Sequence, residues 1–325
     1  MNKSELLSKI EKFVLEKDYA SARKLIRNDL KRLGSKFEYY FYMGYASTDV
    51  EERMKNYEKA YELEPENLDV LINLSNVKDE MGDYESAING YNKVLEKDAS
   101  NALVYNNRGY SYFQKGDYEK ALDDYSNALR LSPKLKIAEC NREELINILK
   151  DDKRYSELVE KSNELQNDYM YHFNLGIQEM NSNNTNEALF AFNKVIDLNP
   201  SFATVYMFIG IIEFQQENYE KAYEYYTKAI ERDSKLIDAY FNRAQIVFGT
   251  KTEDKDILLN AISDLEQAVN LDNKFVDAYY SMAVIYKNLG EYKKSIELLD
   301  KILEIDEQSI NARALKKLLI KKYLN

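Results

Sequence analysis

The stretch 102–135, ALVYNNRGYSYFQKGDYEKALDDYSNALRLSPKL, decides the fold of this chain. Its first half forms one helical stripe with the spacing i, i+3, i+4 and i+7, made by Tyr105, Arg108, Gly109 and Tyr112. Gly116 and Asp117 then interrupt the helical pattern as a turn. The second half resumes the pattern and ends at Pro133. The stretch therefore predicts two helices joined by a tight turn.

Small residues recur on the faces that the two predicted helices turn toward each other. Gly109, Ala121 and Ala128 allow the helix backbones to approach closely, and tyrosines such as Tyr118 and Tyr125 fill the remaining volume. A hairpin of this size cannot bury its apolar face alone, so it must stack on neighbouring hairpins.

The chain repeats itself with a period of about 34 residues. Pro65, Pro133 and Pro200 lie 68 and 67 residues apart, close to two periods. Five residue pairs keep a step of 34: Tyr84 and Tyr118, Ala87 and Ala121, Gly176 and Gly210, Tyr206 and Tyr240, Ala188 and Ala222. A fixed period of this length indicates an array of supersecondary units rather than one central core.

The repeated pattern resembles the tetratricopeptide repeat. It reads Tyr-x2-Leu/Arg-Gly-x2-Tyr, then Gly-Asp-Tyr-x2-Ala, then an aromatic residue, Ala and Pro, as in YHFNLG (171–176) and GDYEKAL (116–122). The resemblance implies an all-α fold, an α–α superhelical solenoid of about nine helical hairpins and a C-terminal capping helix, as one domain over 1–325. We predict units at 3–33, 37–67, 68–101, 102–135, 139–167, 169–202, 203–236, 237–275 and 276–309, with the capping helix at 310–324.

Four units depart from the pattern. The first lacks the glycine and the proline, and the second is three residues short, which we assign to its inter-helix turn near Asp49 and Val50. The fifth has Ile146 where the glycine belongs, so we expect a local change of superhelix pitch there. The eighth carries about five extra residues, in GTKTEDKD (249–256), which we place between its helices.

Composition places the chain among folded proteins without a membrane span. Charged residues make up 31% and hydrophobic residues 45%. Cys140 is the single cysteine, which excludes an intramolecular disulfide and fits a reducing compartment. The first twenty residues have no apolar core typical of a signal peptide, and no stretch approaches the roughly 20 apolar residues of a membrane span. We predict a cytoplasmic protein.

Charge is distributed unevenly along the chain. The net charge is −11, yet residues 1–36 hold ten Lys/Arg against five Asp/Glu, and 310–325 hold five basic residues and no acid. The middle of the chain is therefore strongly acidic, and it repels the phosphate backbone of nucleic acids. We expect no nucleic-acid ligand.

The residues that carry catalysis and metal binding are scarce. The one histidine, His172, occupies a site where other units place tyrosine on the packing stripe, and Cys140 has no partner base marked by the sequence. A zinc site needs several Cys or His ligands. No phosphate-binding loop is present either. We predict that the chain is not an enzyme and has no cofactor and no metal.

Binding is the favoured function. The resemblance implies that the first helices line a concave groove and that an asparagine two residues before the small residue contacts a bound peptide. An amide both donates and accepts, which suits the alternating groups of a peptide backbone. The asparagines at this site are Asn73, Asn107, Asn174 and Asn242.

The predicted groove is apolar in units six to eight. Sites on the same helix face carry large apolar side chains: Phe173, Ile177 and Met180, then Met207, Ile211 and Phe214, then Phe241 and Phe248. An alternative role for some of these aromatic residues is packing between helices. Apolar side chains on a water-facing surface indicate a ligand with an apolar face, and methionines adapt to varied partners. We predict a protein or peptide partner, apolar or amphipathic, such as a helix laid in the groove.

A second function competes with the adaptor role. The basic ends of one copy are able to meet the acidic body of another, which describes a subunit of a self-assembling or multiprotein complex. The last helix has leucines for covering the final repeat and lysines outside, so it is interpreted as a solenoid cap. The alternative for this helix is contact with an anionic membrane or an acidic partner.

Overall fold

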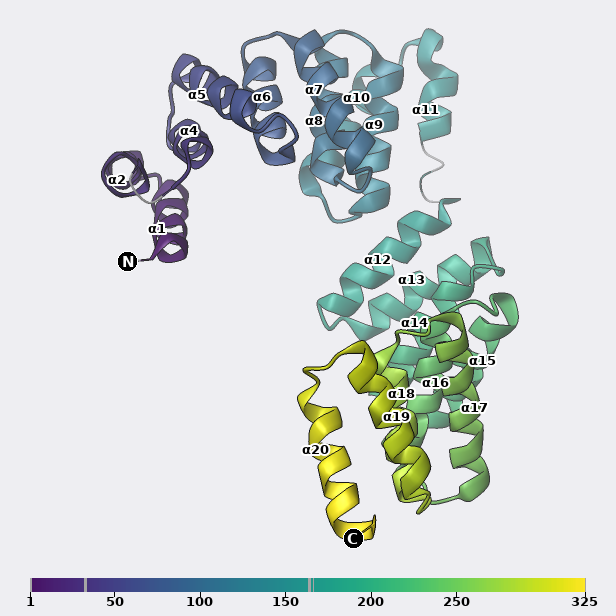
Figure 1. Ribbon diagram of the computed structural model, residues 1–325. Helices are drawn as coiled ribbons and strands as arrows, with labels where there is room; N and C mark the ends of the chain where they lie inside the picture. The colour runs from purple at the N-terminus through teal and green to yellow at the C-terminus, as the bar shows by residue number, and fades with distance from the viewer. Residues whose placement is uncertain (1, 32–33, 163–164, 166, 325) are drawn as a thin grey trace. The chain divides into compact units, whose positions relative to one another are not determined.

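The computed structural model describes residues 2–31, 34–162, 165 and 167–324, and over these residues the chain is helical and contains no strand (Figure 1). Contacts group the chain into two compact units, Met1–Leu175 and Gly176–Asn325, whose boundary falls inside one helix. Within the described part of the chain, no helix is both long and apolar enough to cross a membrane.

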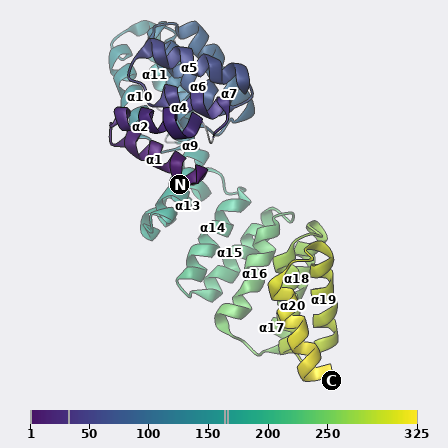
Figure 2. The same cartoon turned by 60° about the vertical axis from the view of Figure 1, so that its left-hand side comes forward.

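Consecutive helices pack in pairs, which confirms the predicted all-α fold of stacked hairpins (Figures 1 and 2). The pairs of the first unit are α1 (Lys3–Leu15) with α2 (Tyr19–Leu25) and η1 (Ile26–Leu30), α4 (Lys36–Tyr45) with α5 (Val50–Leu63), α6 (Leu68–Glu80) with α7 (Tyr84–Lys97), α8 (Ala102–Gln114) with α9 (Tyr118–Leu131), and α10 (Lys136–Leu149) with η2 (Lys153–Tyr155) and α11 (Ser156–Ser162).

The second unit begins within the next helix and continues the same alternation. Its helices are α12 (Tyr169–Asn181), α13 (Thr185–Leu198), α14 (Ala203–Gln215), α15 (Tyr219–Arg232), α16 (Ile237–Thr250), α17 (Lys255–Leu271), α18 (Val276–Asn288), α19 (Tyr292–Ile305), α20 (Ile310–Leu319) and η4 (Ile320–Leu324).

Local chemistry makes the hairpin turns. Before α9, Gly116 has a φ of +79°, a left-handed conformation that favours glycine. The next residue, Asp117, caps α9 by accepting from the backbone N–H of Lys120. The same pair of residues precedes α7, where Asp83 accepts from the backbone N–H of Ser86 at 3.2 Å. The Gly-Asp signal in the sequence therefore ends one helix and starts the next.

Close approach of the two helices explains the recurring spacing of small residues within the repeat. In the α14–α15 hairpin the ring of Tyr226 lies against Gly210, and a Cβ at Gly210 would be 2.6 Å from a ring carbon. The hairpin of α6 and α7 reverses this arrangement. There the first helix carries Ser75 and the second carries Gly90, whose Cβ would lie 1.9 Å from the Ser75 hydroxyl oxygen.

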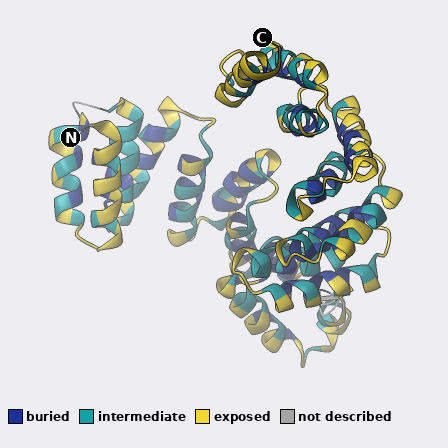
Figure 3. Cartoon of the chain, turned by 90° about the horizontal axis from the view of Figure 1, so that it is seen from below, coloured by how far each residue is buried: buried dark blue, intermediate teal, exposed yellow. Residues whose placement is uncertain are grey.

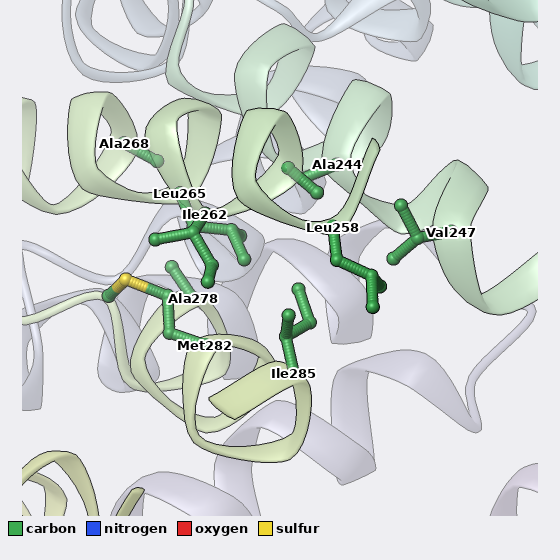
Figure 4. Packing of buried hydrophobic residues seen from close by; sticks show 10 residues of the cluster. Ala244, Val247, Leu258, Ile262, Leu265, Ala268, Ala278, Met282 and Ile285 are labelled. Atoms are coloured by element: carbon green, nitrogen blue, oxygen red, sulfur yellow. The ribbon is translucent and has the colours of Figure 1, made fainter. Parts of the chain in front are cut away.

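Stacking of one hairpin on the next builds the core. In the second unit, a cluster from α16, α17 and α18 includes Ala244, Leu258, Leu265, Met282 and Ile285, all nearly inaccessible (Figure 4). Along many of the helices one side is buried and the other is exposed, as Figure 3 shows, whereas α14 is covered on all sides. At the C-terminus α20 buries Ala312 and Leu319 against α18 and α19, which is the packing expected of a cap.

Three irregular units differ in detail from the prediction. The missing residues of the second unit shorten its first helix, because α4 has 10 residues where α6 and α8 have 13. Most of the insertion in the eighth unit lengthens a helix, because α17 has 17 residues where α15 has 14. The fifth unit begins at Lys136 rather than at residue 139, so Glu143, not Ile146, stands at the glycine site.

Candidate binding site

Several of the predicted groove residues are used in packing. Met207 is only 6% exposed, so its side chain belongs to the interior. Phe241 and Phe248 pack against the core of α16, α17 and α18. Phe214 makes an edge-on contact with Tyr219, with ring centroids 5.4 Å apart. Burial against neighbouring helices therefore accounts for these four apolar residues without a ligand.

Like Phe214, Phe241 and Phe248, the other four predicted apolar residues are half-buried and keep part of their surface. Ile177 and Met180 on α12 and Ile211 on α14 are half-buried and belong to the second compact unit. Phe173 is also half-buried but belongs to the first unit. The second unit therefore offers three partly exposed aliphatic or thioether side chains from two first helices.

The predicted asparagines make hydrogen bonds within the chain. The side-chain amide of Asn73 donates to the carbonyl of Asp69 in its own helix at 2.8 Å. The amide of Asn174 donates to the carbonyl of Arg130 at 2.7 Å, which ties α12 to α9. Asn242 on α16 is half-buried. The amides of Asn73 and Asn174 thus have one donor satisfied and retain capacity for a further bond.

Asn107 belongs to a continuous chain of amides across α6, α8 and α10, which we name the asparagine chain. Asn141 donates to Asn106 at 2.9 Å, Asn106 donates to Asn107 at 3.1 Å, and Asn107 donates to Asn76 at 3.0 Å. The hydroxyl of Tyr91 donates to the same oxygen of Asn76 at 2.7 Å. Of these four amides the sequence predicts only Asn107. Asn76 and Asn106 occupy other repeat positions, whereas Asn141 holds the position of Asn107 one period later and is missed because the fifth unit is predicted three residues too late.

A carboxyl group lies beside the asparagine chain. Ser111 on α8 donates its hydroxyl to Asp79 on α6 at 2.5 Å. Burial raises the pKa of Asp79, and the hydrogen bond from Ser111 opposes this change. The first helices α6 and α8 are therefore joined by polar groups that are satisfied within the fold.

Exposed apolar side chains flank the asparagine chain on α8 and α10. Four of them, between 41% and 56% exposed, form what we name the α8–α10 apolar strip: Leu103, Tyr110, Ile137 and Ile148. Leu103 and Tyr110 are seven residues apart on α8, so they lie on one side of that helix, and α8 packs against α10. The strip thus combines apolar side chains with the half-buried amide of Asn141.

The sequence contains a signal for this strip in the 34-residue period. Leu103 and Ile137 are 34 residues apart, so they hold the same position in consecutive repeats. The fifth unit was placed three residues too late, which moved Ile137 out of its helix. With α10 beginning at Lys136, the apolar character of the first-helix face extends into the first compact unit.

A buried ion pair fixes α8 to α9 close to the strip. Arg108 donates two hydrogen bonds to Asp124, at 2.8 and 2.7 Å, and a third to the side-chain oxygen of Asn92 at 2.7 Å. Burial raises the pKa of Asp124, and the Arg108 guanidinium opposes the rise. The same pair recurs as Arg243 and Asp264 in the second unit. In both places it ties the two helices of one hairpin together.

The described residues include no group of three or more His, Cys, Asp or Glu placed to hold a metal ion. Cys140 is exposed on α10, and His172 lies on α12 with its ring 5.3 Å from that of Tyr171. The candidate site consists of apolar side chains and amide groups, which bind a ligand through apolar contacts and hydrogen bonds.

Comparison with known proteins identifies the repeat. A model of the tetratricopeptide repeat matches residues 102–135 and 203–236, a second model of this repeat matches 258–319, and a TPR repeat model matches 76–116. Anaphase-promoting complex subunit 3 of Schizosaccharomyces pombe is 25% identical over 127 residues, which is 39% of this chain and 18% of that protein. The chain therefore spans less than a fifth of this relative's length.

Solved structures of similar chains include yeast Tom70, with 18% identity and a TM-score of 0.48, covering 93% of this chain and 58% of that one. The first TPR domain of Spaghetti, bound to an HSP90 peptide, has 22% identity and a TM-score of 0.35. It covers 38% of this chain and 94% of the Spaghetti domain.

Proposed function

Because this chain is a tetratricopeptide repeat protein, we propose that it is an interaction scaffold that binds a protein segment on the faces of its first helices. The observation that carries the proposal is the α8–α10 apolar strip. Its four side chains are about half exposed on two helices that pack together. Neighbouring apolar side chains left in water favour a partner that covers them.

The chemistry of the strip defines the class of ligand. Leu103 and Tyr110 lie two helical turns apart, roughly 10 Å along α8. An amphipathic segment with apolar residues at about this separation fits the strip, and a helix presents them at i and i+7. The amide of Asn141, which is half-buried on α10, donates to Asn106 and supplies further hydrogen-bonding capacity. We therefore propose an apolar or amphipathic peptide as the ligand.

The second compact unit offers a further contact surface to the same class of ligand. Ile177, Met180 and Ile211 are its half-buried members. We propose that these three residues, rather than Met207, meet a partner there. Glutamate in place of Met207 would bury a carboxylate, which is costly without a partner charge, so that substitution tests stability more than binding.

The proposed role is binding without catalysis, in the cytoplasm. The single cysteine supports a reducing compartment because it leaves the chain without an intramolecular disulfide. A subunit of a larger assembly is the second candidate function. The uneven charge of the chain favours it, with basic residues at both ends and an acidic middle.

The test is affinity capture with Leu103→Glu/Ile137→Glu beside wild type, quantified by mass spectrometry and repeated with the purified partner by calorimetry. Both side chains are about half exposed, so we expect the variant to keep its helix content. A matched control is Leu15→Glu/Phe190→Glu, which adds the same charge at exposed apolar residues elsewhere. We expect the control to retain the partner and the strip variant to lose it.

Equal recovery by all three proteins would refute the α8–α10 strip as the binding site. A parallel variant, Ile177→Glu/Ile211→Glu, separates the two compact units. If only this second variant loses the partner, the binding site lies on α12 and α14 and the proposed function stands at a different surface.

A further inference from the structure

The insertion in the eighth repeat creates a cavity away from the proposed binding faces. A cavity of about 600 Å³ lies between α15, α16 and α17 in the second unit. The extended first turn of α17 forms one wall, with Ile257 and Asn260. Ile246 and Thr250 of α16 form another wall. Ile246 and Thr250 lie on the side of α16 opposite to Phe241, so the cavity is separate from the first-helix face.

One rim of the cavity is acidic. Glu220, Tyr223 and Glu224 of α15 are exposed at i, i+3 and i+4 and line the cavity. Arg243 also lines the cavity, but its guanidinium donates two hydrogen bonds to Asp264, at 2.8 and 2.6 Å. Among the described residues, neither glutamate has an ion pair. Two like charges one turn apart repel each other until a cation is supplied.

The outer face of α20 carries the complementary pattern. Lys317 and Leu318 of α20 and Lys321 of η4, which continues this helix, are exposed at i, i+1 and i+4. The opposite face of the helix is occupied, because Ala312 and Leu319 are buried. Lys316, on the same side as Lys317 and Lys321, is bound to Asp300. Within the described part of the chain, Lys317 and Lys321 have no ion pair. The helix therefore offers two cations one turn apart, with a half-exposed leucine beside them.

We propose that the cavity of one copy of this chain receives the outer face of α20 from a second copy. The glutamates and the lysines have the same one-turn spacing and opposite charges, so each lysine meets one glutamate when the helices lie antiparallel. Leu318 then covers Tyr223 and Ile257, both about half exposed on the cavity rim. Pairing replaces two repulsive like-charge contacts by two attractive ones.

The geometry sets the kind of assembly. Each copy carries one cavity and one α20, so the contact joins two different surfaces. Such a contact closes as a reciprocal pair or continues from copy to copy. This inference concerns a surface separate from the one proposed for the peptide, so either is able to fail without the other.

The test is sedimentation velocity of the full chain over a concentration series at low and high salt. We expect self-association that weakens as salt screens the charges. Lys317→Glu/Lys321→Glu and Glu220→Lys/Glu224→Lys each replace two attractions by two repulsions. Each should weaken association by roughly tenfold, because two exposed ion pairs of about 0.7 kcal/mol each are lost. An equimolar mixture of the two variants should regain it.

A matched control removes the same charge from the other basic end. Lys24→Glu/Arg27→Glu changes two exposed cations of α2 and η1 and should leave association unchanged. Circular dichroism verifies that every variant keeps its helix content. A wild type that stays monomeric at all concentrations overturns the proposal. So does a mixture of the two charge variants that stays monomeric, or a control that abolishes association.

Discussion

The reversed contact between α6 and α7 provides the sharpest test of the packing. Replacing Gly90 by alanine would put a methyl carbon 1.9 Å from the hydroxyl oxygen of Ser75 and 3.1 Å from its Cβ. The hydroxyl has little freedom to move away, because it is buried and donates to the carbonyl of Leu71 at 2.7 Å. The Gly90→Ala variant must therefore separate the helices or break that bond.

Three energies decide the size of the effect. Overpacking a core contact costs about 1–3 kcal/mol, and loss of the Ser75 hydrogen bond costs about 0.5–1.5 kcal/mol. The higher helix propensity of alanine returns about 1 kcal/mol. We expect Gly90→Ala to lower the free energy of unfolding by about 1–3 kcal/mol. Ser75→Gly/Gly90→Ala removes the clash and should lie within about 1 kcal/mol of wild type.

Urea unfolding followed by circular dichroism measures the total effect, and hydrogen exchange of the α6 and α7 amides localises it, since repeats open in part. Ser75→Ala/Gly90→Ala is the matched control, because it removes the hydroxyl but keeps the Cβ at 3.1 Å. It should recover only part of the loss. If Gly90→Ala is as stable as wild type, or if the glycine–alanine exchange brings no recovery, the described contact is incorrect.

Two further predictions concern buried charge. Asp124→Ala leaves the Arg108 guanidinium without its carboxylate and should cost about 3 kcal/mol in urea unfolding, whereas Arg108→Met/Asp124→Leu should cost less; equal losses would contradict this account. Burial raises the pKa of Asp79 above its unfolded value of about 3.9, so the folded state holds its proton more tightly and the free energy of unfolding falls as pH rises through this range. Asp79→Asn keeps an acceptor for Ser111 without the charge, so thermal unfolding from pH 4 to pH 7 should show its advantage over wild type growing with pH; a constant difference would exclude Asp79 as the source.

The regular hairpins follow from local signals in the sequence. The Gly116-Asp117 turn and the packing of Gly210 against Tyr226 are set by residues within one repeat, so pattern reading places their helices to within a residue or two. The fifth unit lacks these signals. Its second helix is short, at Ser156–Ser162, and its glycine site holds Glu143, so the 34-residue step was the remaining guide to its register.

Burial of the candidate site depends on neighbours that one repeat does not reveal. Met207 occupies a groove position by its spacing, yet its surroundings in the fold leave it 6% exposed. Ile137 also lies on the groove face of a first helix and is half exposed, because neighbouring helices leave that face of α10 open. The hydrogen bonds of Asn107 likewise depend on Asn76 and Asn106, which lie at other repeat positions. Side-chain exposure is therefore a tertiary property here.

The asparagine chain has a direction. Each amide from Asn141 to Asn76 gives its N–H to the carbonyl oxygen of the next, so all four dipoles are ordered in the same sense. Tyr91 fixes one end. Burial raises the pKa of its phenol, so the hydroxyl stays protonated and donates a hydrogen bond to Asn76. Reversing one amide would oppose two donors or two acceptors at each junction. The amides of α10, α8 and α6 therefore share one collective polarity across three hairpins, with Asn76 held at its end by Tyr91.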